Sequence, residues 1–205
     1  MKAQIFFIVA ASIPLLFVAC GEKDNPSATI KAVDIGLSVK WSNVNLGASS
    51  PEGYGDFYAW GETEPKATYT TDNYLYSDTP TTLPLSADAA HKKLGGSWRM
   101  PTRTEIEELV STMEDTNYSW EWKSINGHNG WLVTFLVNQN TIFFPAAGYQ
   151  WDDVLEGRGS VGAFWSSTLE RKYSECAWNF EYDSDGVQSF FDDRFVGTSI
   201  RPVQP

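Results

Sequence analysis

The chain contains few of the residues on which metal and thiol chemistry depend. Its 205 residues include two cysteines, Cys20 and Cys176, and two histidines, His91 and His128. Neither histidine has a second ligand at the spacing that zinc sites use, such as i,i+4 on a helix. Cys176 follows Glu175, and because an adjacent carboxylate raises a thiol pKa, we interpret this cysteine as a small apolar side chain. We therefore expect no metal and no cofactor.

Two common catalytic motifs are also missing. The sequence has no Gly-x-Ser-x-Gly nucleophile turn and no glycine-rich loop that would hold a phosphate. A carboxylate pair for glycoside hydrolysis cannot be chosen from 26 Asp and Glu residues without coordinates. We expect no catalytic residues and no enzymatic activity. A hydrolase or an oxidase remains one alternative, and a structural component of a surface assembly is another.

Positive charge is scarce as well. Fifteen Lys and Arg residues stand against 26 Asp and Glu residues, and the net charge at pH 7 is −11. A chain this acidic is repelled by phosphate backbones, and no basic stripe appears along it. We therefore do not expect it to bind nucleic acid.

The only long apolar run lies at the N-terminus. Residues 5–19 follow Lys2 and are too few to span a bilayer, which needs about 20 apolar residues. This pattern predicts a secretory signal at residues 1–19. The sequence LFVAC at residues 16–20 resembles a bacterial lipobox, although Phe17 stands where Leu is commonest. The resemblance implies cleavage before Cys20 and acylation of this cysteine, for instance with palmitate. The alternative is an ordinary signal peptide followed by a chance cysteine.

Residues 20–30 then form the lipidated cysteine and a polar tether, because this stretch contains Pro, Ser and charges but no hydrophobic period. Several acyl chains would hold the protein firmly to a membrane. The sequence GEKD at residues 21–24 resembles the signal that exports such lipoproteins to the cell surface. We expect an outer-membrane location, with the protein anchored by lipid and facing the exterior.

Residues 31–205 are expected to form one α+β domain with its helices early and its strands late. Two short helices are predicted, over residues 88–94 and 103–114; Thr102 and Glu105 have the spacing of a capping box before the second. Strands are predicted at 33–41 and 56–60, with a long loop at 61–85 between them and the helices. Antiparallel strands and hairpins dominate the second half, at 131–137 with 141–144 and at 177–182 with 187–191.

Six short motifs in order resemble one family. They are VDIGLSVKW at 33–41, GDFYAWGE at 55–62, GGSWRMPT at 95–102, PAAGY at 145–149, FWSS at 164–167 and SIRPV at 199–203. Together they resemble the Fibrobacter succinogenes major paralogous domain, found in lipoproteins of the Bacteroidota. The resemblance implies a C-type-lectin-like fold, related to that of formylglycine-generating enzymes and of retroelement-diversified receptors. Those enzymes need a pair of cysteines, and this domain contains one.

The acidic sequence Asp183-Ser184-Asp185-Gly186 has two interpretations. Two aspartates and a serine resemble part of a calcium loop, but a calcium ion takes six to eight oxygen ligands. The stretch also lies between two alternating aromatic segments, where Asp, Ser and Gly are typical of a tight turn. We favour the bend, and the calcium site stays as the alternative.

Residues 169–196 are the expected recognition surface. In the diversified relatives that the resemblance implies, the last part of the domain displays the variable side chains. The matching stretch here mixes rings, acids and amides, which suit contact with a sugar or a protein. We expect a glycan, peptide or protein ligand, bound by Tyr173, Asn179, Glu181, Gln188, Phe190, Asp192, Asp193 and Arg194.

Overall fold

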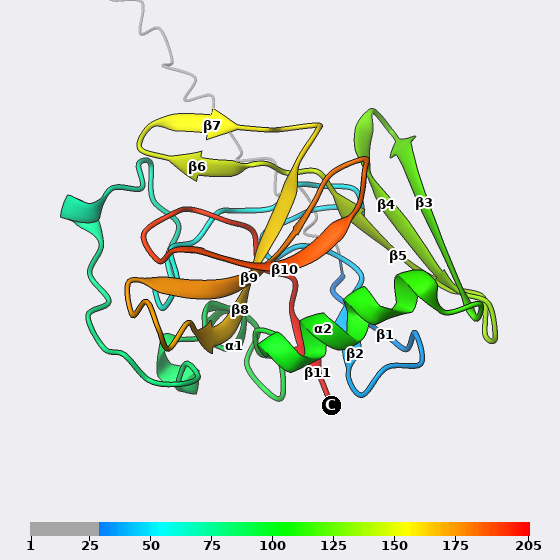
Figure 1. Ribbon diagram of the computed structural model, residues 1–205, viewed down its shortest axis with the longest axis horizontal. Coiled ribbons are helices and arrows are strands. Elements are labelled where there is room, and N and C mark those ends of the chain that lie inside the picture. The colour runs from blue at the N-terminus through cyan, green and yellow to red at the C-terminus, as the bar shows by residue number, and fades with distance from the viewer. Residues whose placement is uncertain (1–28) are drawn as a thin grey trace, which may run out of the picture.

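The computed structural model describes residues 29–205 (Figure 1). The predicted signal peptide, Cys20 and nearly all of the tether lie outside the described residues. Within residues 29–205, no helix is both long enough and apolar enough to cross a membrane.

The described chain is α+β, with few helices and mostly antiparallel sheets, as predicted. Two α-helices come early, α1 (Ala89–Leu94) and α2 (Arg103–Ser111), and short 3-10 helices cover Thr71–Asn73, Leu85–Ala87 and Thr112–Glu114. Four small antiparallel sheets hold the strands. They are β1 (Ala32–Val33) with β2 (Lys40–Ser42) and β11 (Val203–Gln204); β3 (Tyr118–Ile125) with β4 (His128–Phe135) and β5 (Asn140–Pro145); β6 (Tyr149–Trp151) with β7 (Val154–Glu156); and β8 (Gly162–Leu169) with β9 (Cys176–Tyr182) and β10 (Val187–Asp193).

Both predicted helices form where their capping residues place them. Asp88 caps α1 by accepting a hydrogen bond from the backbone N–H of His91, and Gly95 ends the helix with a φ of 68°. Thr102 and Glu105 form the predicted capping box at the start of α2. The Glu105 carboxylate also forms an ion pair with Arg99, with 2.5 Å between Oε1 and Nη2, and this pair holds the segment before the helix against its first turn. Satisfied N-terminal N–H groups explain why α2 begins at Arg103.

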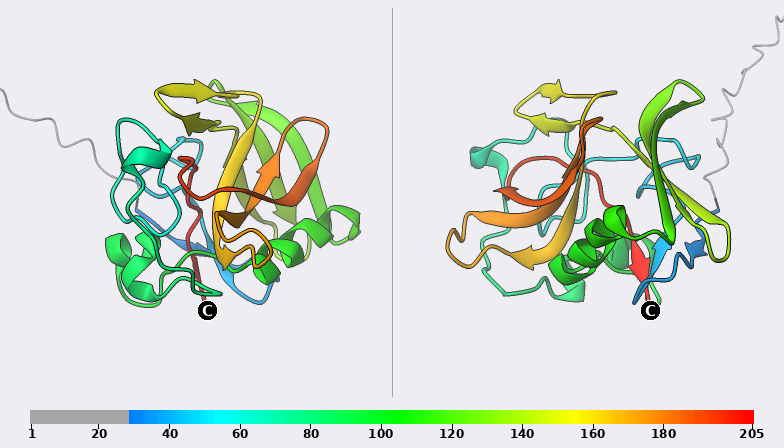
Figure 2. Two further views of the ribbon diagram at one scale, coloured as in Figure 1. Left: turned by 60° about the vertical axis from the view of Figure 1, so that its left-hand side comes forward. Right: turned by 45° about the vertical axis from the view of Figure 1, so that its right-hand side comes forward.

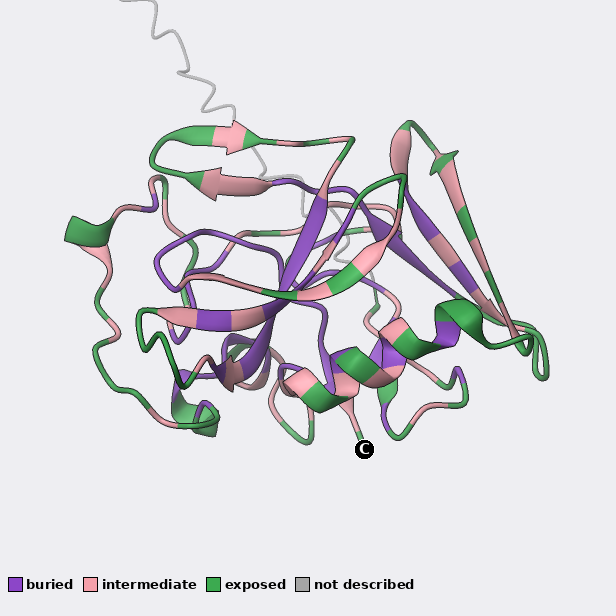
Figure 3. Ribbon diagram, in the orientation of Figure 1, coloured by how far each residue is buried: buried purple, intermediate pink, exposed green. Residues whose placement is uncertain are grey.

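Two hydrophobic clusters lie on opposite faces of the β8–β9–β10 sheet. Trp165 on β8 belongs to the first, with Tyr58, Trp60 and Ile200. The second contains Phe164 and Phe180 from the same sheet together with the following residues: Trp41, Ile106, Leu109, Val133, Ile142 and Phe144. Helix α2 therefore packs against the β8–β9–β10 sheet and also contacts residues of the β3–β4–β5 sheet through this cluster (Figure 2). Because β8 is covered on both faces, almost all of it is buried, whereas β10 is partly exposed (Figure 3).

Arg201 is a completely buried cation among neutral partners. Its guanidinium donates to the Asn45 side chain at 2.9 Å and to the carbonyls of Ser42 at 3.1 Å and Phe143 at 2.7 Å. Burial lowers the pKa of this guanidinium to about 10. The planar guanidinium thus joins three distant segments of the chain, which is a structural role.

The structure also differs from the predicted elements. Residues 56–60 form no regular strand, only an isolated bridge between Tyr58 and Thr198, which lies near the C-terminal end of the chain. Strand β3 and the β6–β7 hairpin were not predicted. The alternation of Tyr118, Trp120 and Trp122 is nevertheless a strand signal in β3.

Candidate functional site

The β9–β10 hairpin brings five of the eight predicted binding residues to one face. Its register pairs Glu181 with Gln188 and Asn179 with Phe190, and it places Asp192 opposite Ala177. Side chains alternate between faces along a strand, so all five belong to the same side of the sheet. Tyr173 precedes β9, Asp193 points to the other face, and Arg194 follows the end of β10.

Two of the eight residues are buried, which corrects the prediction of one exposed set. Asn179 is 2% exposed and Arg194 is 5% exposed. Strand β9 is the middle strand of its sheet, and Asn179 lies between Trp165 on β8 and Phe190 on β10. Neither side chain is available to a ligand at the surface in this conformation.

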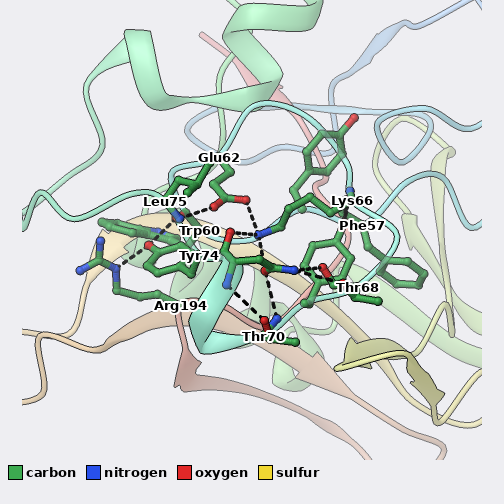
Figure 4. A network of polar contacts seen from close by, with 12 residues as sticks. Phe57, Trp60, Glu62, Lys66, Thr68, Thr70, Tyr74, Leu75 and Arg194 are labelled. Atoms are coloured by element: carbon green, nitrogen blue, oxygen red, sulfur yellow. Dashed lines mark hydrogen bonds and ion pairs between the residues drawn. The ribbon is translucent and has the colours of Figure 1, made fainter.

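Arg194 instead fastens the long loop of residues 61–85 to the domain. It donates to the Tyr74 hydroxyl at 2.8 Å, to the carbonyls of Tyr76 at 2.6 Å and Asp78 at 2.8 Å, and to Ser174 at 2.9 Å. Its guanidinium carbon also lies 4.8 Å from the ring centroid of Trp60 and within 6 Å of two tyrosine rings. Figure 4 shows this arginine beside Tyr74 and Trp60. These carbonyl partners could not be predicted from the sequence, because they belong to the backbone of distant loops.

Four aromatic rings gather around β10, and we call them the ring cluster: Tyr173, Trp178, Phe190 and Phe191. Phe191 is central, with the ring centroids of Tyr173 at 5.9 Å, Trp178 at 5.4 Å and Phe190 at 5.4 Å. Tyr173 and Phe190 are the exposed members, at 40% and 44%. Since β10 is the end strand of its sheet, rings from both faces meet around its free edge.

Arg103 of α2 covers one side of the ring cluster. Its guanidinium carbon lies 3.3 Å from the Trp178 ring centroid, and its Nε donates to Glu107 at 2.7 Å. A guanidinium stacked on an indole fixes both groups, so the cluster is supported by the helix. Neither Arg103 nor Trp178 was among the predicted binding residues. The alternation of aromatic residues in β9 contained the signal for Trp178 but not for its contact with Arg103.

Acidic side chains lie on the face of the β9–β10 hairpin that is opposite to Trp178. Burial raises the pKa of Glu181, and the nearby charges of Asp192 and Asp183 raise it further. Burial also raises the pKa of Asp192, and the negative charge of Asp193 adds to this effect. Burial raises the pKa of Tyr149 on β6, and the charges of Glu156, Asp192 and Glu181 raise it further.

A polar hollow of about 250 Å³ opens at the turn end of this face. Glu181 and Gln188 line it, together with Val161, Tyr182, Val187 and the Asp183 and Gly186 ends of the turn. Carboxylate and amide groups at a shallow opening can accept and donate hydrogen bonds to the hydroxyl or amide groups of a ligand.

Cys176 lies at the far end of the hairpin, opposite Asp193. Its Sγ is 3.7 Å from a carboxylate oxygen of Asp193. Burial, together with the charges of Asp193, Glu175 and Asp192, raises the pKa of this thiol to about 12. A thiol with so high a pKa is a poor nucleophile at neutral pH.

The Asp183–Gly186 segment has the geometry of the predicted bend. Asp183 Oδ1 accepts hydrogen bonds from the backbone N–H groups of Asp185 at 2.8 Å and Gly186 at 3.2 Å, and the Asp183 N–H donates to the Gly186 carbonyl at 3.0 Å. One carboxylate oxygen is thus used to hold the turn. Among residues 29–205, no three His, Cys, Asp or Glu side chains are grouped so as to hold a metal ion.

We define the β10 surface as the accessible part of this region: Tyr173, Glu181, Gln188, Phe190, Phe191 and Asp192. It combines exposed rings with hydrogen-bonding acids and an amide on a supported hairpin. Such a surface can stack against the apolar face of a ligand while its carboxylates accept hydrogen bonds.

Comparisons with protein-family models, with curated proteins and with solved structures gave no match to this chain.

Proposed function

We propose that this protein is a membrane-anchored surface lipoprotein whose domain recognises a ligand without catalysis. The observation that carries the proposal is the β10 surface. Exposed rings and polar side chains lie together on it, and Arg103 of α2 stacks on Trp178 of the ring cluster. A preformed surface loses less conformational entropy on binding than a mobile one.

The ligand classes that suit this surface are a glycan, a peptide or a protein partner. Phe190 exposes 44% of its surface beside the half-buried Asp192, so one ring and one acceptor are offered together. A sugar presents an apolar ring face and hydroxyl donors, and a peptide presents side chains and N–H donors. The strongly acidic chain disfavours anionic ligands.

We also propose the C-type-lectin-like fold and the family named above. Their support is the resemblance of six ordered motifs, together with an α+β structure that has two short early helices and antiparallel strands later in the chain. Anchorage at residue 20 rests on the lipobox resemblance alone. Labelling cells with a radioactive fatty acid tests it, since Cys20→Ser should abolish incorporation into this protein.

Binding to glycan and peptide arrays tests the recognition proposal. We expect the protein to bind a narrow set of ligands, and we expect Phe190→Ser and Asp192→Asn to remove that binding without changing the melting temperature. Val137→Ser is the matched control, because Val137 is 70% exposed in the turn between β4 and β5. Equal binding by all three variants would show that the β10 surface does not make the contact.

The hydrolase alternative has one observation in its favour. The pKa values of Glu181 and Asp192 are both raised, and such shifts occur at catalytic carboxylates as well as at binding surfaces. The substitution Glu181→Gln distinguishes a hydrolase from a binding protein. Turnover of a screened substrate that disappears in this variant would establish an enzyme, whereas a binder shows a change in affinity and no turnover.

A further inference from the structure

A second concave site lies in the long loop that precedes α1. It has a volume of about 460 Å³. Its lining comes from residues 61–64 and Lys66, which we call the first wall, and from Leu75, Tyr76, Ser86 and Ala87, which we call the second wall. We call it the loop cleft. Its size falls within the range of small-molecule sites, and its lining is separate from the β10 surface.

Side-chain bonds hold the two walls of the loop cleft together. One Glu62 oxygen accepts the backbone N–H of Leu75 at 2.7 Å, and the other pairs with Lys66 at 2.8 Å (Figure 4). Lys66 also donates to the backbone and side-chain oxygens of Asn73 at 3.1 and 3.0 Å. Arg194 fixes the backbone of Tyr76 from behind. The cleft is therefore preformed, although it belongs to a loop.

The charged groups of the loop cleft neutralise one another. The Glu62 and Lys66 side chains are only 10% and 20% exposed and form an ion pair. Glu64 pairs with Lys93 at 2.5 Å. Each carboxylate in the lining has its own ammonium partner, so a charged ligand finds no unpaired opposite charge and would lose solvation on entering.

The remaining lining is uncharged, with the hydroxyl groups of Thr63 and Ser86 beside apolar side chains, and it contains a strongly exposed leucine. Leu75 is 82% exposed although its backbone is fixed by Glu62. Beside it, the Tyr76 ring packs on Gly61, where a Cβ would lie 2.3 Å from Tyr76 Cδ1 and where φ is +80°. An apolar side chain this exposed gains free energy when a ligand covers it.

We propose that the loop cleft binds one uncharged aromatic ring, which packs against Leu75 and the ring of Tyr76. A flat ring can bury the leucine side chain and pack edge-to-face or offset against the tyrosine. The ring belongs to a small molecule, because the volume of the cleft lies within the range of small-molecule sites. This site does not depend on the β10 surface, and each can fail while the other stands.

Saturation-transfer NMR of the purified protein with p-cresol tests the proposal. We expect saturable binding with a Kd on the order of 1 mM, which is the affinity that so small a ring reaches. Leu75→Ser should weaken binding about tenfold by removing the apolar contact. Ser86→Trp should abolish it, because Ser86 is exposed and an indole there would fill the cleft. Val137→Ser, which removes an exposed apolar side chain elsewhere, should leave it unchanged.

Further probes test the ligand class. Benzoate and benzylamine should bind several-fold more weakly than p-cresol, because the lining charges are already paired. Acetyl-Gly-Tyr-Gly-amide distinguishes a free ligand from the side chain of a protein partner. We expect it to bind more weakly than p-cresol, and equal binding would overturn the assignment to a small molecule. No saturable p-cresol binding, or equal binding by Leu75→Ser and Val137→Ser, would overturn the proposal.

Discussion

Replacing Arg194 by methionine should loosen the long loop and destabilise the whole domain. The arginine donates four hydrogen bonds, one to the Tyr74 hydroxyl and three to backbone carbonyls, and it is 5% exposed. None of these four partners is a carboxylate. Methionine retains much of the apolar stem but leaves all four acceptors without their donor.

The expected loss is about 3 kcal/mol of unfolding free energy. A hydrogen bond to a charged group contributes about 1.5–3 kcal/mol, so four of them would exceed this figure if every acceptor stayed dry. Ser174 and Asp78 are exposed residues, however, and their carbonyls can recover water when the loop opens. The substitution therefore first makes local opening of the loop easier, and only part of the lost free energy appears in the global unfolding equilibrium.

Urea denaturation and amide hydrogen exchange measure the two parts separately. The urea midpoint should fall by about 1–2 M, and exchange should accelerate most in residues 74–83. Arg194→Lys should be nearly as unstable as Arg194→Met, since an ammonium cannot reproduce the planar fork. Arg103→Met is the control, because Arg103 also stacks on an aromatic ring but lies at the surface. Full rescue by lysine, or unchanged exchange in the loop, would refute the reasoning.

Three further outcomes follow from the local geometry. Thr102→Ala should remove the capping box of α2 and cost about 1 kcal/mol in chemical denaturation, with helical circular dichroism largely kept. Asp183→Ala should cost about 1 kcal/mol because two backbone N–H groups of the bend lose their acceptor; calcium that raised the melting temperature of the wild type but not of this variant would instead support the calcium interpretation. The free energy of unfolding should fall above pH 10, as measured by chemical denaturation alongside tyrosinate absorbance. Burial raises the pKa of Tyr69 to about 12 and raises that of Tyr182 as well, so the unfolded chain loses these protons first. The stabilisation present below pH 10 is therefore lost as the pH rises through the pKa values of the folded state. The lowered pKa of Arg201 acts in the opposite direction but is a single group, so a flat stability curve between pH 9 and about 12 would contradict the assignment.

The features that the sequence predicted well are those decided by neighbouring residues. The capping box needs only Thr102 and Glu105, and the bend at 183–186 needs only the side chain of Asp183 and a small residue after it. The β9–β10 hairpin follows from period-two alternation on either side of that bend. Each of these is stabilised by contacts within a few residues, so local sequence contains the necessary information.

The features that it predicted poorly depend on which strand occupies which place in the sheet. Alternation assigns Asn179 and Phe190 correctly to one face, but it gives no indication that β9 is the middle strand and β10 the edge. This strand order explains why Asn179 is 2% exposed whereas Phe190 is 44% exposed. The isolated bridge at Tyr58 has the same cause: its partner, Thr198, is 140 residues away along the chain.

The position of Arg194 links the two proposed sites through one structural element. It directly follows β10, which carries the β10 surface, and its guanidinium holds the backbone of Tyr76, which lines the loop cleft. A substitution at Arg194 should therefore weaken binding at the loop cleft through loss of its preformed shape, even though this arginine contacts no ligand. A substitution at Leu75 removes the apolar contact without touching that support. Comparing the two variants shows whether the cleft depends on its shape as well as on its lining.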